Sequence, residues 1–356
     1  MVLSASSPSA LAETGDDSYV YFRKQGLFAF VGIVAMFFIS KIDYRKYKKF
    51  WKVAYWGSVV LLLLVLVPGI GKSVNGAKRW VSIGIQFQPS EVAKIGLIIF
   101  YAAYLAENKR NLKGIWDGFI KPLLPLAIPI GILFIVQDHL SASIVIIAVV
   151  GIMMLVAGCK LRYFLTCGIL AGGGMISAMF ALAKATGKGG FRLARITSFL
   201  DPWQDAQGSG WQIIQSLYAI GSGGLFGVGL GESKQKYLYI SEPHNDFIFA
   251  VVAEELGFVG CLIVIALFAI FIWRGVVIAM KAPDTFGSLV AVGITSLIGL
   301  QAIINIAVVT SSMPVTGMAL PFFSYGGTSL LILLCSVRCT LKHITSGKQN
   351  IKQEEK

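Results

Sequence analysis

Long apolar runs separated by short polar segments recur along this chain from residue 26 to residue 341. Most of these runs are long enough to form a helix that crosses the hydrocarbon core of a bilayer. The pattern therefore predicts an all-α, polytopic integral membrane protein, a helical bundle with nine spans. We expect these spans at 26–40, 53–70, 91–106, 119–136, 139–158, 163–183, 247–273, 287–310 and 323–341.

The composition supports a membrane protein. Hydrophobic residues make up 56% of the chain and charged residues 14%, where a soluble domain has about 25% charged residues. The formal net charge of +13 would suit nucleic acid, but much of the basic charge lies in short loops between apolar runs. We therefore expect contacts with anionic membrane lipids and no nucleic acid partner. The five cysteines form no CxxC pair, so neither a disulfide framework nor a metal cluster is indicated.

Basic residues mark alternate loops of the predicted topology. Because short loops rich in lysine and arginine stay in the cytoplasm, we place there the loops 41–52, 107–118, 159–162 and 274–283 and the tail, which ends in the basic segment 342–356. The segments 1–24, 69–90, 184–246 and 311–322 are then external, and 184–246 is one large extracellular loop.

In this topology Met1 lies outside the cell, after an odd number of spans. Either the N-terminus inserts facing outward, or a first helix is missing from this sequence. We favour the missing helix, because residues 1–7 read like the exit of one. Residues 10–12 resemble a signal-peptide cleavage site, but no basic region precedes them, so no signal peptide is predicted.

Several charged residues lie where a bilayer penalises charge. Glu91 begins a predicted span, where it complements the helix dipole, and Lys94 lies one turn further on. Glu254 and Glu255 fall inside the span 247–273, where each charge costs about 2.5–3.5 kcal/mol on insertion scales. Such residues normally face a cavity or a partner, so Lys94 with Glu255 is a candidate ion pair.

Specific motifs extend along the whole chain: Gly76-Ala-Lys-Arg-Trp80, Gln88-Pro-Ser-Glu-Val-Ala-Lys94, Arg195-Ile-Thr-Ser-Phe-Leu-Asp-Pro-Trp203, Gly210-Trp-Gln-Ile-Ile-Gln-Ser216, Gly224-Leu-Phe-Gly-Val-Gly-Leu-Gly231, His244-Asn-Asp-Phe-Ile-Phe249, Glu254-Glu-Leu-Gly257 and Thr316-Gly-Met-Ala-Leu-Pro-Phe-Phe-Ser-Tyr-Gly-Gly-Thr-Ser329. In these motifs the chain resembles the SEDS family (shape, elongation, division and sporulation), which includes FtsW, RodA and SpoVE. The resemblance covers the chain from residue 4 to about 341.

The resemblance implies ten spans with both ends in the cytoplasm, so most of the first span is absent here, and a single membrane domain over residues 1–356. It implies a peptidoglycan glycosyltransferase in the plasma membrane that polymerises lipid II and works with a class B penicillin-binding transpeptidase. The acid of the family's His-x-Asp-Phe motif, regarded as catalytic, corresponds to Asp246. A functionally important tryptophan corresponds to Trp80.

Some motifs distinguish subgroups of the family. The sequences His139-Leu-Ser and Ser241-Glu-Pro-His-Asn-Asp246 are closer to FtsW-type proteins of Gram-positive bacteria than to RodA, which predicts a role in cell division and a place at the septum. Relatives often have Pro-Asp-Leu-Gly where this chain has Asp138-His-Leu-Ser141, so the role of that acid is not carried over.

The implied reaction joins the C4 hydroxyl of one disaccharide to C1 of a strand held on undecaprenyl pyrophosphate, with inversion at C1. The hydroxyl needs a base and the anionic leaving group needs positive charge, as in the divided roles of inverting glycosidases. We assign the base to Asp246. The residues predicted to bind substrate are Lys94, Arg192, Arg195, Lys234 and Lys236, which are cationic, together with Trp80, Glu91 and Glu255.

Plainer roles are possible for each residue. Asp246 could cap a helix, the basic residues could meet lipid headgroups at about 1 kcal/mol each, and Trp80 could anchor at the interface. The glycines from Gly221 to Gly231 lack nucleotide-binding spacing and indicate a flexible or tightly turned loop.

For the whole protein, the alternative functions are a lipid II flippase and a non-catalytic scaffold for the transpeptidase. No cofactor is expected, and a divalent cation that assists pyrophosphate departure is left open.

Overall fold

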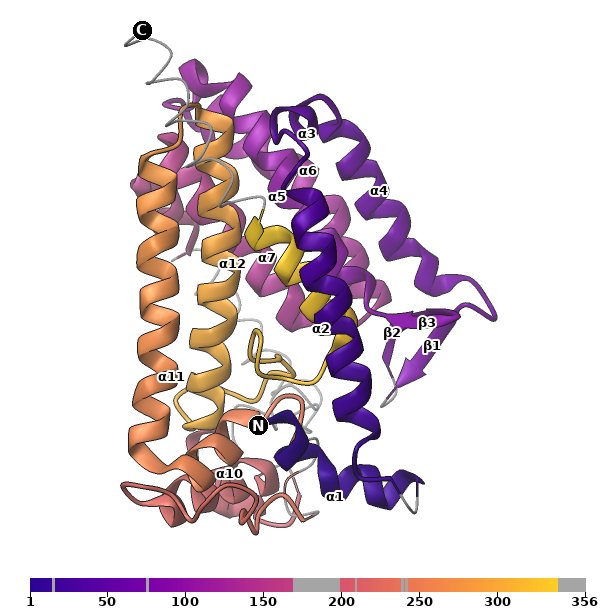
Figure 1. The fold of residues 1–356 in the computed structure, drawn as a ribbon. Helices are drawn as coiled ribbons and strands as arrows, with labels where there is room; N and C mark the ends of the chain where they lie inside the picture. The colour runs from indigo at the N-terminus through magenta and orange to yellow at the C-terminus, as the bar shows by residue number, and fades with distance from the viewer. Residues whose placement is uncertain are drawn as a thin grey trace, which may run out of the picture. The chain divides into compact units, whose positions relative to one another are not determined.

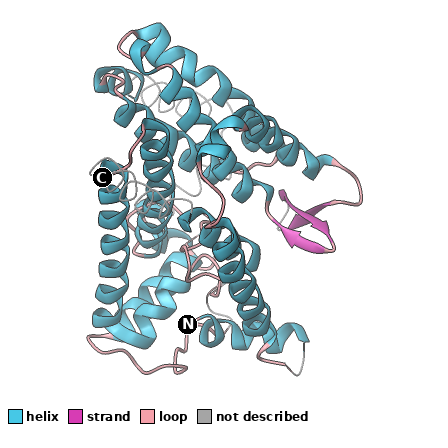
Figure 2. Cartoon of the chain, turned by 45° about the horizontal axis from the view of Figure 1, so that its top comes forward, coloured by secondary structure: helices cyan, strands magenta, loops and turns pink. Residues whose placement is uncertain are grey.

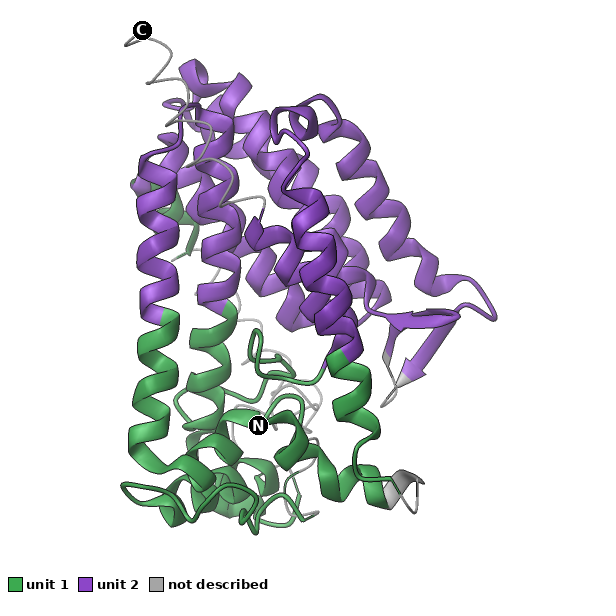
Figure 3. Cartoon of the chain, viewed as in Figure 1, with its two compact units in different colours: residues 1–26, 162–268, 301–325 green, residues 27–161, 269–300, 326–356 purple. Residues whose placement is uncertain are grey.

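A computed structural model describes residues 1–14, 17–74, 77–168, 199–208, 210–237, 240 and 243–338. Helices account for most of this part of the chain, and three strands form one small sheet (Figures 1 and 2). The chain divides into two compact units, each assembled from segments that are distant in sequence (Figure 3). Unit 1 comprises residues 1–26, 162–268 and 301–325, and unit 2 comprises residues 27–161, 269–300 and 326–356.

The multi-pass helical architecture predicted from the sequence is confirmed. The described residues contain six helices that are long and apolar enough to cross a membrane: α2 (Val20–Ile39), α5 (Pro89–Glu107), Trp116–Val136, α7 (Leu140–Ala157), α11 (Ile248–Met280) and α12 (Thr285–Val309). Two shorter apolar helices, Trp51–Leu66 and Gly327–Arg338, coincide with the spans expected at 53–70 and 323–341. The span expected at 163–183 lies mainly outside the described residues.

The elements outside the long helices are short. They are the helix α3 (Arg45–Lys49), the 3₁₀ turns η1 (Leu64–Leu66) and η2 (Lys109–Asn111), and the π-helical segments η3 (Trp116–Ile120) and η4 (Ile132–Val136), which flank α6 (Lys121–Gly131).

Within unit 2, α4 (Trp51–Leu63) packs closely on α5 and also contacts α6. A Cβ at Gly96 of α5 would lie 2.1 Å from the Ser58 hydroxyl of α4, so the glycine permits the approach. Inside α6, Pro129 has no N–H group, which deprives the Pro125 carbonyl of its helical donor. The Tyr55 hydroxyl of α4 donates to that carbonyl at 2.8 Å. The proline-rich span is therefore stabilised by its neighbour.

Within the segment 69–90, which was predicted to be external, the described residues form a three-stranded antiparallel sheet that the sequence analysis did not predict. Its strands are β1 (Gly71–Val74), β2 (Ala77–Ile83) and β3 (Ile85–Phe87), in the order β1-β2-β3. Arg79 of β2 donates from Nε to the Gln137 carbonyl at 3.2 Å and from Nη2 to the Asp138 carbonyl. This side chain connects the sheet to the start of α7.

Unit 1 contains ordered structure where the sequence suggested polar loops. The N-terminal residues form α1 (Val2–Thr14), and the predicted extracellular loop 184–246 contains η5 (Pro202–Asp205) and α10 (Trp211–Gly223) in its described part. The Ser216 hydroxyl of α10 donates to the Val309 carbonyl at the end of α12 at 2.5 Å. The beginning of α11 is interrupted at Gly257, whose φ is 65° and ψ −165°.

Candidate functional site

The predicted catalytic acid, Asp246, is half-buried in a turn directly before α11. Asn305 of α12 is buried, and its side-chain amide donates to the Asp246 carbonyl at 2.7 Å and to the Met318 carbonyl at 2.6 Å. A Cβ at Gly317 would lie 3.1 Å from Asp246 Oδ2, so the segment 316–318 lies against the carboxylate. One buried amide thus holds the Asp246 turn and that segment together.

The two residues before Asp246 are held by the same C-terminal motif. The Tyr325 N–H donates to the His244 carbonyl at 2.8 Å, and the Ser324 hydroxyl donates to the Asn245 carbonyl at 2.6 Å. The rings of His244 and Tyr325 also pack together, with centroids 5.8 Å apart. Three successive carbonyls of the turn therefore each accept a hydrogen bond, and these main-chain contacts determine its path.

Lys236 and Glu255, both predicted to bind substrate, pair with each other inside unit 1. Lys236 Nζ lies 3.0 Å from Glu255 Oε1, and the two side chains are 3% and 0% exposed. Nζ also donates to the Gly231 carbonyl at 2.6 Å and to the Ser4 hydroxyl at 3.1 Å, and that hydroxyl in turn donates to Glu255. The pair connects α1, the chain that leads to Asp246, and α11.

Glu254 has a similar internal role. Its Oε2 accepts from the Ser233 hydroxyl at 2.5 Å and its Oε1 from the Lys234 N–H at 2.9 Å. The Lys234 side chain is exposed. Both intramembrane acids of α11 are therefore bound to residues 231–236.

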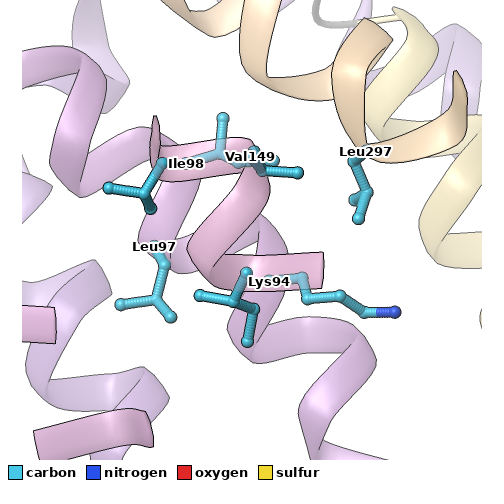
Figure 4. Close-up of a pocket in the computed structure, with 7 residues that line it drawn as sticks. Lys94, Leu97, Ile98, Val149 and Leu297 are labelled. Carbon is cyan, nitrogen blue, oxygen red and sulfur yellow. The ribbon is translucent and has the colours of Figure 1, made fainter. Parts of the chain in front are cut away.

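Lys94 lies on α5 in unit 2, 4% exposed, with its Nζ 2.7 Å from Glu91 Oε1. The predicted Lys94–Glu255 ion pair is corrected, because each member has another partner: Glu91 lies one helical turn from Lys94, and Lys236 binds Glu255. Lys94 also lines a small cavity that is otherwise apolar (Figure 4), lined by Leu97, Ile98, Ile146, Val149, Val150 and Leu297. Glu91 compensates the ammonium charge that this cavity would otherwise bury.

His139 precedes α7 and connects it to α5. Its Nδ1 accepts from the Ala142 N–H at 3.1 Å, and its Nε2 lies 2.9 Å from Gln88 Nε2. Burial, together with the positive charges of Arg79 and Lys94, lowers the pKa of His139 to about 3. The ring is therefore neutral at physiological pH, and it holds the residue that precedes α5.

The remaining predicted site residues are more dispersed. Trp80 is half-buried on β2 in unit 2, whereas Arg192 and Arg195 lie outside the described residues. Within the part of the chain that the structure describes, no cluster of three or more His, Cys, Asp or Glu side chains could hold a metal ion.

The sequence analysis missed Asn305, Ser324 and His139. Asn305 could have been recognised from the sequence, because its polar side chain lies inside the predicted span 287–310. Polar residues in a bilayer normally face other parts of the protein. Ser324 lies within a motif that was recognised as a whole, without a role for each residue.

These features define a multi-pass helical membrane protein with a fixed acidic turn where a span begins. The model of the FtsW, RodA and SpoVE family of cell cycle proteins matches residues 1–347. The chain is 43% identical over 323 residues to stage V sporulation protein E of Bacillus subtilis, which covers 90% of this chain and 86% of that protein. It is 43% identical over 338 residues to the protein of a Geobacter species named probable peptidoglycan glycosyltransferase FtsW, with 95% and 90% covered.

The fold is also similar to that of a solved chain from a peptidoglycan synthase complex. The TM-score is 0.79 at 29% identity, with 98% of this chain and 97% of that chain covered. This protein belongs to the FtsW, RodA and SpoVE family of cell cycle proteins. The family membership predicted from the motifs is confirmed.

Proposed function

We propose that the protein is a peptidoglycan glycosyltransferase that polymerises lipid II into glycan strands and releases undecaprenyl pyrophosphate. Relatives with about 40% identity over most of the chain carry the name probable peptidoglycan glycosyltransferase, which supports the proposal. The structural observation that carries it is the Asp246 turn. Donors from residues 305–325 bind three of its successive carbonyls and fix an acid where α11 begins.

In the proposed reaction Asp246 is the general base. It accepts the proton of the acceptor C4 hydroxyl while that oxygen attacks C1 of the donor strand. The bond between C1 and the pyrophosphate oxygen breaks, the pyrophosphate leaves with the electron pair, and the configuration at C1 inverts. A fixed turn suits this role, because a displacement of about 1 Å in a catalytic group can cost about 100-fold in rate.

The other site residues receive proposed roles according to their surroundings. The exposed Lys234, together with Arg192 and Arg195, would stabilise the leaving pyrophosphate. Glu91, Lys94 and Trp80 remain proposed substrate-binding residues. Lys236 and Glu255 are better explained as positioning residues, because each is buried against the other.

We also propose a class B penicillin-binding transpeptidase as the partner and the division septum as the site of action. The similarity to a chain of a peptidoglycan synthase complex supports such a partner. The FtsW-type relatives support a role in division, and the similarity to a sporulation protein makes a sporulation septum the alternative place.

Lipid II polymerisation by the purified protein with its partner transpeptidase tests the proposal. We expect glycan strands from the native protein and from Glu232→Gln, which changes an exposed acid of unit 1, and none from Asp246→Ala or Asp246→Asn. All variants must show equal thermal unfolding and equal complex formation.

Equal polymerisation by the Asp246 variants would refute the role of this acid as base. If the native protein makes no polymer but moves lipid II across the vesicle membrane, the protein is a flippase. If neither activity is present but the transpeptidase requires the protein for crosslinking, the protein is a scaffold.

A further inference from the structure

Residues 224–231, called here the glycine loop, connect α10 to the chain that leads to Asp246. The loop alternates glycines with large apolar side chains and has no charged residue. Its backbone follows a defined path rather than that of a flexible linker: φ is positive at Gly224 (52°), Gly227 (81°), Gly229 (111°) and Gly231 (89°). Glycine adopts such angles without steric cost, so the repeated glycines encode the path of the loop.

The glycine loop lies on α11 where Gly257 interrupts the helix. The interruption removes helical partners from main-chain groups on both sides of it. Four hydrogen bonds between the loop and α11 replace them. The loop donates from Val228 N to Glu254 O (3.0 Å) and from Gly229 N to Glu255 O (3.2 Å), and α11 donates from Phe258 N to Gly224 O (2.9 Å) and from Val259 N to Leu225 O (3.1 Å). A Cβ at Gly227 would lie 2.1 Å from the Glu255 carbonyl oxygen, so this approach requires glycine.

The large side chains of the glycine loop are exposed, although its main chain is bound to α11. Phe226 is 80% exposed, and Leu225, Val228 and Leu230 are exposed as well. The next residues of α11, including Phe258 and Leu262, also present exposed apolar side chains. Because α11 is long and apolar enough to cross a membrane, its exposed apolar side chains suit contact with lipid, and the hydrogen bonds at 258 and 259 make the loop surface continuous with them.

We propose that the glycine loop is an interfacial membrane anchor that inserts Leu225, Phe226 and Leu230 among the acyl chains of the leaflet beside α11. Non-helical main chain is tolerated there when its polar groups are paired, and the bonds to α11 supply this pairing. The exposed charged residues Glu232 and Lys234 follow at once, as expected where the chain returns to the headgroups. The charge distribution of the chain predicts that this leaflet is the outer one.

Site-specific photocrosslinking tests the anchor independently of any enzymatic activity. The photoreactive residue p-benzoylphenylalanine replaces the exposed aromatic Phe226, where its size is accommodated. The same probe at Leu262 of α11 is the lipid-facing reference, and the probe at Glu232 is the polar control. Full-length protein is irradiated in vesicles of phosphatidylethanolamine and phosphatidylglycerol and in cell membranes, and adducts are identified by mass spectrometry.

We expect the yield of phospholipid adducts at position 226 to equal that at 262 and to exceed that at 232 several-fold, in vesicles and in cell membranes. A yield at 226 no higher than at 232 would overturn the proposal. Adducts to another protein in place of lipid in cell membranes would also overturn it, since the loop would then be a protein-docking surface.

Discussion

Removal of the Lys236 ammonium tests how unit 1 fixes the chain that leads to Asp246. Lys236→Met keeps most of the aliphatic side chain but leaves Glu255, whose side chain is 0% exposed, without its cation. The substitution also removes the donors to the Gly231 carbonyl and the Ser4 hydroxyl. We expect a large loss of stability, because the Glu255 carboxylate stays buried without its cation.

The magnitude follows from the burial of both partners. Removal of one partner from a buried ion pair costs about 3–5 kcal/mol, since the other charge stays uncompensated. The double variant Lys236→Met/Glu255→Gln has neither charge, so its cost falls to about 1–3 kcal/mol for the polar groups left unsatisfied. Lys234→Met is the matched control for the unfolding measurements. Its ammonium is exposed, and we expect a change within about 0.5 kcal/mol.

Reversible unfolding in mixed detergent micelles measures these differences, and polymerisation kinetics measure their effect on the reaction. A positioning role lowers kcat per folded molecule and leaves KM for lipid II unchanged, whereas a substrate-binding role raises KM. The reasoning is refuted if Lys236→Met is as stable as Lys234→Met, or if the double variant is less stable than the single one.

Three further substitutions test the surrounding contacts. Asn305→Leu leaves the carbonyl of Asp246 without its donor, so we expect a loss of about 1–3 kcal/mol in unfolding free energy and a fall in kcat in the polymerisation assay. For His139, whose folded pKa of about 3 lies below the unfolded value near 6.5, stability is fully present above pH 6.5 and is lost as pH falls toward 3. Native protein should lose about 2 kcal/mol between pH 7 and pH 5 from this group, and His139→Asn should remove that part of the pH dependence. Gly227→Ala places a Cβ against the Glu255 carbonyl at positive φ and should lower the thermal midpoint, whereas Gly221→Ala, where no atom lies within 4 Å, should not.

Hydropathy alone located the apolar helices that the structure describes, because a bilayer demands long apolar helices regardless of tertiary contacts. It was less reliable at the membrane boundary. The segment 71–87 forms a sheet, although its strands are short and only part of it alternates between apolar and polar residues. The segments 1–14 and 211–223 are helical although they were assigned to polar external segments, because their apolar residues are too few for a span but enough to pack within unit 1.

Side-chain partners were the least predictable part of the site. The sequence showed that Lys94 needed an acid, but Glu91 at i−3 on the same helix and a distant glutamate were both compatible with it. The bonds that hold the Asp246 turn involve main-chain carbonyls, which every residue possesses. Their partners therefore have no sequence signature, apart from the presence of an amide such as Asn305 within a span.

The contacts of Glu254 and Glu255 in α11, and those of the Asp246 turn directly before it, predict different effects of substitution. Glu254 and Glu255 are bound through their carboxylates, which accept hydrogen bonds from residues 233–236. The main-chain carbonyls of residues 244–246 accept hydrogen bonds from residues 305–325. The carboxylates of Glu254 and Glu255 therefore contribute to stability, whereas the main-chain hydrogen bonds of the Asp246 turn remain when the Asp246 side chain is replaced. Substitution of Glu254 or Glu255 should therefore reduce the folded fraction, and substitution of Asp246 should remove activity from protein that is still folded.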